Sequence, residues 1–443
     1  MTSLVWFRDD LRLVDHPALL AAAERGEPVT ALYILDDRAA GRPLGGASKW
    51  WLHHSLNALR GALDEHGVQL VLRRGPAETV LPEVVQEVGA RSVVWNRRYG
   101  NAREIDAQLK SALRAGGLEV QSFAANLLYE PWTIQTGSGT PYAVYTPFWR
   151  ACLAAPAPRQ PLPAPERIHG GAPIASDALD DWALLPTAPD WAGGLRENWV
   201  PGEAGAQRRL AAVVAGGLSD YGVGRDFADR AVTSRLSPHL RFGELSPFQL
   251  WAATQSLTAS APAEVAKFRS ELGWREFAWH TLFSFPELAT RNWRASFDAF
   301  PWPEHNPVAF AAWTAGETGI DLVDAGMREL WHTGTMHNRV RMVVASLLTK
   351  NLLIDWRRGE QWFWDTLVDA DEAANPFNWQ WVAGSGVDAA PYFRIFNPEL
   401  QAAKFDPSGQ YRQRWLGDGL RPQPIVDLAA SRTAALDAYK SIR

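Results

Sequence analysis

The first 130 residues alternate short runs of β-branched and other apolar residues with longer amphipathic segments. Such runs predict strands, and the amphipathic segments between them predict helices. The predicted strands are Leu4–Arg8, Val29–Leu35, Gln69–Arg74, Ser92–Asn96 and Glu119–Phe123. Strands that alternate with helices indicate a parallel sheet covered on both faces, with ligands expected beyond the carboxyl ends of the strands.

A different pattern follows this α/β region. Residues Ala154–Ser176 contain six prolines and two adjacent glycines, and because proline fixes φ and removes a backbone donor, they predict an extended connector rather than a packed element. After about residue 200 the strand signal fades, and apolar residues at i, i+3 and i+4 predict helices. The predicted division is an α/β domain at 1–130, a connector at 131–199 and an all-helical domain at 200–443.

Composition narrows the class of protein. The 443 residues are 47% hydrophobic and 21% charged, as in a folded globular chain. The single cysteine, Cys152, excludes a disulfide framework and a cysteine-ligated cluster, and it fits a reducing, cytoplasmic location. The N-terminus is too charged for a signal peptide, and no run of about 18 uncharged apolar residues predicts a membrane span. The net charge of -5 gives no global reason to expect nucleic acid, although it is compatible with a local basic patch.

Polar side chains interrupt the apolar faces of two predicted helices. At about 100° per residue, the residues that share these faces are Phe268, Glu271 and Arg275 on one helix and Asn338, Arg341 and Met342 on the other. With 22 tryptophans in the chain, such faces indicate a polar hole with aromatic walls. The alternative interpretation is that they are surface charges on ordinary helices.

A third segment brings two carboxylates, Asp369 and Asp371, just ahead of Asn375. Because buried charge is costly unless it is paired, these aspartates are expected to pair with Arg275 and Arg341. A calcium loop is excluded, because Ala374 stands where such a loop needs glycine and Gln380 stands where it needs glutamate. No metal site is expected.

Three hydroxyl side chains, Thr233, Ser234 and Ser237, lie beside arginines at the start of a predicted helix. Free backbone N–H groups at a helix start favour a bound phosphate. The alternative is that Ser237 and Ser246, each followed by proline, are ordinary helix N-caps.

Several longer segments resemble the photolyase/cryptochrome family. They are WREF (274–277), TGTMHNRVRM (333–342), DWRRGE (355–360) and WQWVAGSGVDAAPYFRIFNP (379–398), and the opening LVWFRDDLRLVDHPAL fits the same family. The resemblance covers nearly the whole chain, in the family's order. It implies an α/β N-terminal domain with a Rossmann-like parallel sheet, an all-α C-terminal FAD-binding domain and light-dependent DNA repair.

The resemblance also implies which residues hold FAD. Those that match pyrophosphate and phosphate-end positions are Tyr221, Thr233, Ser234, Leu236 and Ser237. Those that match positions around the isoalloxazine and ribose are Phe268, Arg275, Arg341, Asp369, Asp371 and Asn375. Asn375 matches the position facing flavin N5, where an asparagine cannot donate a full proton and so favours the anionic reduced flavin used for repair.

The implied substrate is a cyclobutane pyrimidine dimer flipped out of UV-damaged DNA. The residues that match its pocket are Trp274 and Trp381 as walls, Glu271 and Asn338 as polar contacts and Met342 as the floor. Members of the family that repair (6-4) lesions have histidine at the position of Asn338, which favours the cyclobutane lesion. Phosphate-contacting positions are matched by Arg225, Arg339 and Arg394, which would make DNA binding depend on salt.

Three tryptophans match the family's electron-transfer chain from the surface to oxidised flavin. Trp379 and Trp356 align without gaps, whereas Trp302 needs a shift of one residue and is open to a chance match. Two other positions depart from the family, because Thr335 and Phe268 stand where tryptophan is common. They slightly favour the alternative function, a cryptochrome-like photoreceptor that binds FAD without repair. The lack of a long C-terminal tail disfavours it.

An antenna chromophore is possible in the family, as a folate, a deazaflavin or a second flavin near the N-terminal domain. Trp51, His53 and Tyr99 lie in segments where such contacts occur, but they fit packing roles equally well. The expected partner is damaged DNA, with no membrane, and the protein is expected to be a monomer. The remaining alternative is a nucleotide-binding α/β domain joined to a helical domain of unrelated chemistry.

Overall fold

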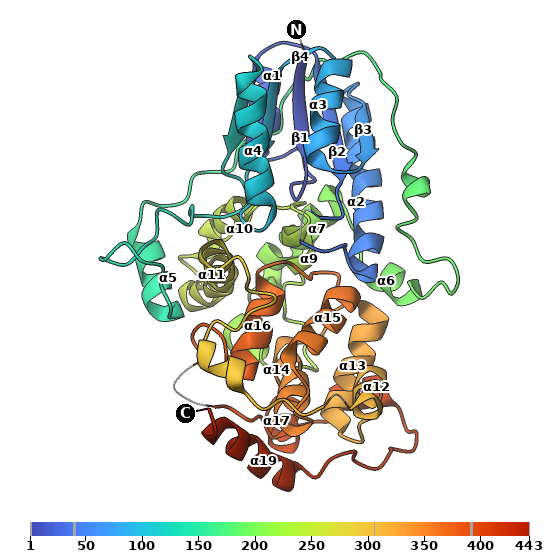
Figure 1. Cartoon of the computed structure of the whole chain (residues 1–443), viewed down its shortest axis with the longest axis vertical. Coiled ribbons are helices and arrows are strands. Elements are labelled where there is room, and N and C mark those ends of the chain that lie inside the picture. The colour runs from blue at the N-terminus through green and yellow to red at the C-terminus, as the bar shows by residue number, and fades with distance from the viewer. Residues whose placement is uncertain (1, 39–40, 305, 390–392, 443) are drawn as a thin grey trace.

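A five-stranded parallel sheet forms the N-terminal part of the computed structural model, which describes residues 2–38, 41–304, 306–389 and 393–442 (Figure 1). Its order is β3-β2-β1-β4-β5. The strands are β1 (Thr2–Phe7), β2 (Val29–Leu35), β3 (Leu70–Arg74), β4 (Ala90–Asn96) and β5 (Glu119–Phe123). All five predicted strands are confirmed, with ends that differ by no more than two residues.

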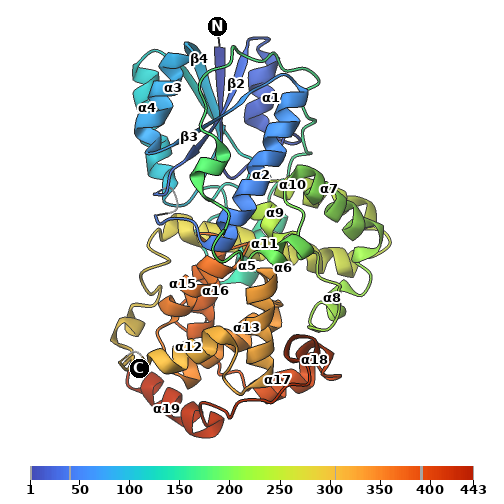
Figure 2. The same cartoon turned by 90° about the vertical axis from the view of Figure 1, so that its right-hand side faces the viewer.

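Alternate residues of the central strand point to opposite faces of the sheet. Val5 and Phe7 pack with helices α1 (Pro17–Glu24) and α2 (Gly46–Glu65). On the other face, Leu4 and Trp6 pack with α3 (Ala77–Glu87) and α4 (Ala102–Ala115). Both faces are therefore covered, as the alternation of strands and helices predicts. The lower end of α2 reaches the helical half of the molecule (Figure 2).

Helices build the rest of the chain, as predicted (Figure 1). They are α7 (Glu203–Ala212), α8 (Tyr221–Gly224), α9 (Ser237–Arg241), α10 (Pro247–Ala253), α11 (Pro262–Ser284), α12 (Pro307–Ala315), α13 (Asp321–Thr333), α14 (Asn338–Ser346), α15 (Trp356–Thr366), α16 (Ala374–Ala383), α17 (Pro398–Phe405), α18 (Gln410–Leu416) and α19 (Leu428–Lys440). Within the described ranges, none of the helices is long and apolar enough to cross a membrane.

The proline-rich segment is extended, as predicted, but it is also hydrogen-bonded to the sheet. It has no helix or regular strand between residues 155 and 176, as predicted, but it lies along the sheet. Gly170 forms an isolated bridge with Val29, and the backbone of Ile174 exchanges hydrogen bonds with the Gln69 amide. The wider region also holds α5 (Tyr145–Ala154) and α6 (Gly193–Asn198). Some backbone donors of the proline-rich segment, those of Gly171 and Ile174, are thus satisfied by residues at the start of β2 and just before β3, which composition alone does not indicate.

The helical pattern over residues 337–368 is interrupted in the structure. Between α14 and α15 the chain makes a π-helical turn, Leu347–Asn351, and then a short break in which Leu353 has a φ of 50°. Asp355 starts α15 by accepting a hydrogen bond from the N–H of Arg357 at 2.9 Å. Apolar spacing continues across this break, so the spacing does not reveal it.

Candidate functional site

Helix α11 carries four of the predicted site residues: Phe268, Glu271, Trp274 and Arg275. The Glu271 carboxylate accepts hydrogen bonds from Arg225 and, at 2.8 Å, from Lys267. A predicted lesion-contacting residue and a predicted phosphate-contacting residue are therefore in direct contact. The guanidinium of Arg225 is half-buried, and this ion pair compensates its charge.

The ring of Trp274 is fixed by a residue that the sequence analysis missed. Tyr145, at the start of α5, stacks on Trp274 with ring centroids 3.7 Å apart and planes inclined by 10°. Its hydroxyl donates to the Ser270 carbonyl oxygen at 2.7 Å. Tyr145 lies in the region assigned to the connector, and no feature of its sequence neighbourhood indicates this contact. It holds one predicted wall of the lesion pocket in place.

A polar cluster joins the start of α9 to α14 and the loop before α16. Arg341 lies 3.3 Å from Asp369, which confirms that expected ion pair. The Ser237 hydroxyl donates to Asp369 at 2.6 Å, and Arg341 donates to the Thr335 hydroxyl at 3.2 Å. Ser237 is thus not an N-cap. Ser246 is one: it caps α10 in a reciprocal pair of hydrogen bonds with Gln249, so the N-cap alternative is confirmed for Ser246 only. Thr335, which stands where tryptophan is common in the family, has a structural role here, because its hydroxyl accepts a hydrogen bond from Arg341.

We expected Arg275 to form an ion pair with an aspartate, and among the described residues it does not. Arg275 donates to the carbonyl oxygen of Asn126 at 2.8 Å and lies 3.6 Å from Glu276. Asp371 instead accepts hydrogen bonds from the N–H groups of Ala373, at 2.9 Å, and Ala374 at the start of α16. Burial raises the pKa of Asp371, although Arg275 and these N–H groups oppose that shift.

Two arginines near the predicted phosphate positions have no carboxylate partner among the described ion pairs. Arg209 donates to the backbone carbonyl oxygens of Ser234 and Thr233, at 2.7 and 3.1 Å. Arg235, with a φ of 52°, lies with its guanidinium 4.3 Å from the Trp199 ring centroid. Burial lowers the pKa of both guanidinium groups. Partly buried guanidinium groups without a direct carboxylate partner, close to Thr233 and Ser234, fit an anionic pyrophosphate.

Two aromatic residues and an apolar one complete this part of the site. Tyr221 and Phe268 are buried and meet edge to face, with ring centroids 5.4 Å apart. Leu236 is buried immediately before α9. Phe268 therefore fills its position by packing on Tyr221, which explains how the chain accommodates phenylalanine there.

Asn375 has both of its amide protons engaged by a single residue. Its Nδ2 donates to the backbone carbonyl oxygen of Glu360 at 3.0 Å and to Glu360 Oε1 at 2.7 Å. Glu360 is 1% exposed. With both protons held there, Asn375 has only an acceptor, Oδ1, to offer to any other group. Glu360 lies in the DWRRGE motif, but its role follows only from the packing of α15 against α16.

The three predicted electron-transfer tryptophans join one apolar cluster, in which Trp356 and Trp379 are buried and Trp302 is partly buried. Helices α15 and α16 approach so closely that a Cβ added at Gly359 would lie 2.2 Å from the Trp379 ring. The Trp356 indole N–H donates to Asn292 at 3.0 Å. Trp302 packs on Phe300, with ring centroids 4.4 Å apart.

The remaining predicted contacts are half-buried or exposed. Asn338 is the exposed first residue of α14, and Met342 follows one turn later, half-buried. Arg394 lies over the half-buried Trp381, 4.9 Å from the ring centroid. Arg339 pairs with Asp226 at 2.7 Å. Residues 390–392 of the C-terminal motif lie outside the described residues.

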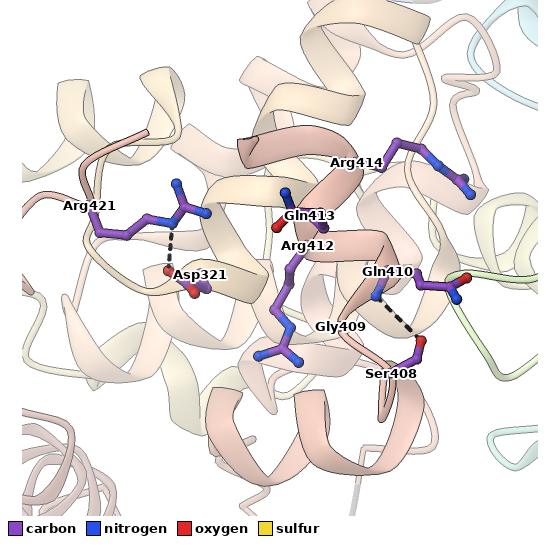
Figure 3. Close-up of a pocket in the computed structure, with 8 residues that line it drawn as sticks. All are labelled: Asp321, Ser408, Gly409, Gln410, Arg412, Gln413, Arg414 and Arg421. Carbon is purple, nitrogen blue, oxygen red and sulfur yellow. Dashed lines mark hydrogen bonds and ion pairs between the residues drawn. The ribbon is translucent and has the colours of Figure 1, made fainter. Parts of the chain in front are cut away.

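A separate surface hollow of about 580 Å³ lies between α13 and α18 and contains none of the predicted site residues. Its lining residues are Asp321, Ser408, Gly409, Gln410, Arg412, Gln413, Arg414 and Arg421. The arginines point in different directions, and Arg421 is paired with Asp321 at 3.4 Å (Figure 3). The lining groups do not converge on one point, so this hollow does not compete with the site above.

The three candidate antenna residues are all buried. Trp51 is fully buried, stacks on Phe242 and donates its indole N–H to Glu244 at 2.9 Å. Tyr99 is buried and donates its hydroxyl to Glu130 at 2.6 Å. His53 is also buried. The contacts of Trp51 are those of a packing residue, whereas Tyr99 also lines a small pocket with Asp9, Arg98 and Arg275.

Comparisons with known proteins find similarity to DNA photolyases along almost the whole chain. Residues 3–166 match the DNA photolyase family, and residues 268–421 match the FAD binding domain of DNA photolyase. A deoxyribodipyrimidine photo-lyase of Agrobacterium fabrum is 50% identical over 99% of this chain and 98% of its own. Cryptochrome-1 of Arabidopsis thaliana is 38% identical over 94% of this chain and 62% of its own. A crystal structure of a bacterial class III photolyase from Agrobacterium tumefaciens superposes with a TM-score of 0.96, at 49% identity, and covers 100% of this chain and 97% of that one.

Proposed function

The chain belongs to the DNA photolyase family, and from that premise we propose that it is a deoxyribodipyrimidine photo-lyase that repairs cyclobutane pyrimidine dimers in DNA with light. The cofactor is FAD. When bound and reduced, FAD supplies, after absorbing blue light, the electron that opens the cyclobutane ring. The protein binds and orients the cofactor and the lesion and controls their surroundings.

The proposed flavin-binding residues fall into groups of different charge, each suited to a different part of FAD. Arg209 and Arg235, with the hydroxyls of Thr233 and Ser234, provide the positive and donor groups for the pyrophosphate. The Arg341–Asp369 pair, steadied by Ser237 and Thr335, offers fixed polar groups to the ring system and ribose. Asn375 presents an acceptor to flavin N5, because Glu360 holds both of its amide protons. These contacts are proposed from the fit of the donor and acceptor groups.

The lesion is proposed to bind between Trp274 and Trp381. Two adjacent pyrimidines need flat apolar walls and a polar group for their carbonyl edges. Glu271 and Asn338 provide the polar groups, and Met342 provides the floor. Arg394, exposed beside Trp381, is the phosphate contact most available to DNA, because Arg225 and Arg339 are each paired with a carboxylate.

The observation that carries this proposal is the order of residues along α11. Glu271, Trp274 and Arg275 lie within about one helical turn, so one rigid element holds both lesion-reading and flavin-holding side chains. The test is dark binding of duplexes with and without a single thymine dimer. We expect the dimer to be favoured by about 10³-fold, the lower end of specific DNA recognition. Equal binding of the two duplexes would contradict the proposal.

A photoreceptor function is the second candidate, favoured by the 38% identity to cryptochrome-1. It predicts bound FAD with no preference for the dimer, so the same binding measurement separates the two functions. We also propose a monomer located in the cytoplasm, which suits a chain whose one cysteine, Cys152, is a buried free thiol. A folate, deazaflavin or flavin antenna remains a proposal, testable from the absorbance of pigment released by denaturation.

A further inference from the structure

A loop of the N-terminal domain is fastened to helix α15. The Trp364 indole N–H donates to the Pro43 carbonyl oxygen at 2.9 Å, and the Gly46 N–H donates to Asp365 at 2.7 Å. Gly45 lies so close to α15 that an added Cβ would be 2.1 Å from the Trp364 carbonyl oxygen. Residues 43–46, just ahead of α2 and at its start, therefore have a fixed position against α15.

This attachment places the guanidinium of Arg42 on Glu360. Arg42 Nη1 donates to Glu360 Oε2 at 2.8 Å and Nη2 donates to Oε1, in a two-point contact. The Arg42 Cζ atom also lies 3.9 Å from the Trp364 ring centroid. Arg42 is the ion-pair partner of a carboxylate that is 1% exposed and that holds both amide protons of Asn375. The three residues form one connected chain from the N-terminal domain to the flavin site.

We propose that Arg42 is a positioning residue for the flavin, acting through Glu360 to keep the Asn375 amide oriented with its oxygen toward flavin N5. A buried carboxylate that loses its cation is strongly disfavoured and changes its hydrogen bonding. Once Glu360 no longer holds both amide protons, the Asn375 amide is free to turn its N–H group toward N5. An acceptor at N5 stabilises the reduced flavin, which carries hydrogen there, and a donor stabilises the oxidised flavin. The N-terminal domain thus helps to set the cofactor's redox state.

The test is the midpoint potential of the bound flavin, followed by its absorbance in an anaerobic titration. Arg42→Met should lower the potential, so that at a fixed applied potential the ratio of reduced to oxidised flavin falls about tenfold, the ratio that follows from about 1.4 kcal/mol, as for a lost charge-assisted hydrogen bond. Gly45→Ala should do the same without changing any charge, because its Cβ would displace the loop from α15. Arg42→Lys, which keeps the charge but not the two-point contact, should fall between wild type and Arg42→Met.

Two control variants and one double variant make the test decisive. Arg38→Met removes an exposed arginine near the same loop that pairs with Asp36 and Glu78. Gly61→Ala adds a Cβ where no atom lies within 4 Å. Both should leave the potential unchanged. In a Glu360→Gln background the effect of Arg42→Met should vanish, since the carboxylate through which it acts is gone.

An unchanged potential in Arg42→Met, or an effect that persists in the Glu360→Gln background, would overturn the inference. The inference rests on the proposed function, but different results would contradict the inference and the proposed function. A purified chain that holds no FAD would contradict the proposed function. A chain that holds FAD at the wild-type potential in every variant would contradict only the role of Arg42.

Discussion

At the residue scale, the hydroxyl of Thr335 offers a direct probe of the flavin site. It accepts one of the hydrogen bonds of Arg341, whose other partners are Met336 and Asp369. Thr335→Val removes the hydroxyl with little change of shape and leaves one N–H of Arg341 unsatisfied. We expect FAD to bind about fivefold more weakly, as for the loss of about 1 kcal/mol. Titration of apoprotein with FAD measures this, and Thr335→Ser should bind as wild type does. Equal affinity in Thr335→Val would contradict the assigned contact.

Glu276 makes stability depend on pH. It is fully buried on α11 and accepts the N–H groups of Leu128 and Tyr129, at 2.8 and 3.3 Å. Burial raises the pKa of Glu276 to about 8, although Arg275 opposes the shift. Between the unfolded value near 4.3 and about 8, the folded state binds more protons than the unfolded state. Glu276 therefore makes stability fall as pH rises through that window.

Glu276→Gln should remove that dependence, because the amide keeps an acceptor for both N–H groups and carries no charge. We expect the unfolding midpoint to rise by at least about 1 °C at pH 8.5, as for about 1 kcal/mol in a chain of this size, and to change little at pH 5. Thermal unfolding of both proteins across this pH range measures it. A gain at pH 5 that equals the gain at pH 8.5 would rule out titration of Glu276 as the cause.

Residue pairing was only partly predictable from sequence. The Arg341–Asp369 pair follows from the cost of burying charge, but the same argument assigned Arg275 to an aspartate. The start of α16 offers free N–H groups that satisfy Asp371, and a backbone carbonyl satisfies Arg275. Backbone groups are not visible in a pattern of side chains, so that competition was missed. Glu360 and Tyr145 were missed because their partners come from other elements.

At the element scale, the approach of α15 to α16 holds Trp379 in place. Gly359→Ala would put a Cβ 2.2 Å from the far edge of the Trp379 ring, so the helices must separate or the ring must turn. We expect destabilisation by about 1–3 kcal/mol, typical of overpacking, with slower photoreduction of oxidised flavin. Denaturant unfolding and flavin absorbance under blue light measure the two effects. If Gly359→Ala unfolded and photoreduced as Gly61→Ala does, the close packing at Trp379 would be refuted.

Elements were predicted well where one signal dominates. The buried strands are continuous β-branched runs, and α11 has clear spacing and proline at its first position. The break between α14 and α15 was missed because the apolar spacing runs through the π-helical turn at Leu347–Asn351. α5 was missed because it precedes the proline-rich segment and was assigned with it.

At the scale of the whole molecule, DNA binding should be governed by local rather than net charge. The chain carries a net charge of -5, yet Arg394 is exposed beside the proposed pocket. Arg394→Ala should weaken binding of damaged and undamaged duplexes alike and reduce the slope of log affinity against log salt by about 1. Arg432→Ala, which removes an exposed arginine on α19, should leave the slope unchanged. Loss of affinity with an unchanged slope would show that Arg394 is not a phosphate contact.

The contacts between the α/β half and the helical half were the least predictable feature of the molecule. The alternation of strands and helices gives the sheet and the helical half separately, but the contact between Arg42 and Glu360 joins residues 318 positions apart. Such a contact leaves no local pattern. The division at residues 131–199 remains a prediction, with the finding that part of this region lies along the sheet.

The most direct test of the central claim is light-driven repair of a short DNA strand carrying one thymine dimer, by reduced protein under blue light with a dark control. Recovery of thymine absorbance in the light alone is the predicted result. No recovery, with FAD bound and reduced, would contradict repair of this lesion and favour the photoreceptor function.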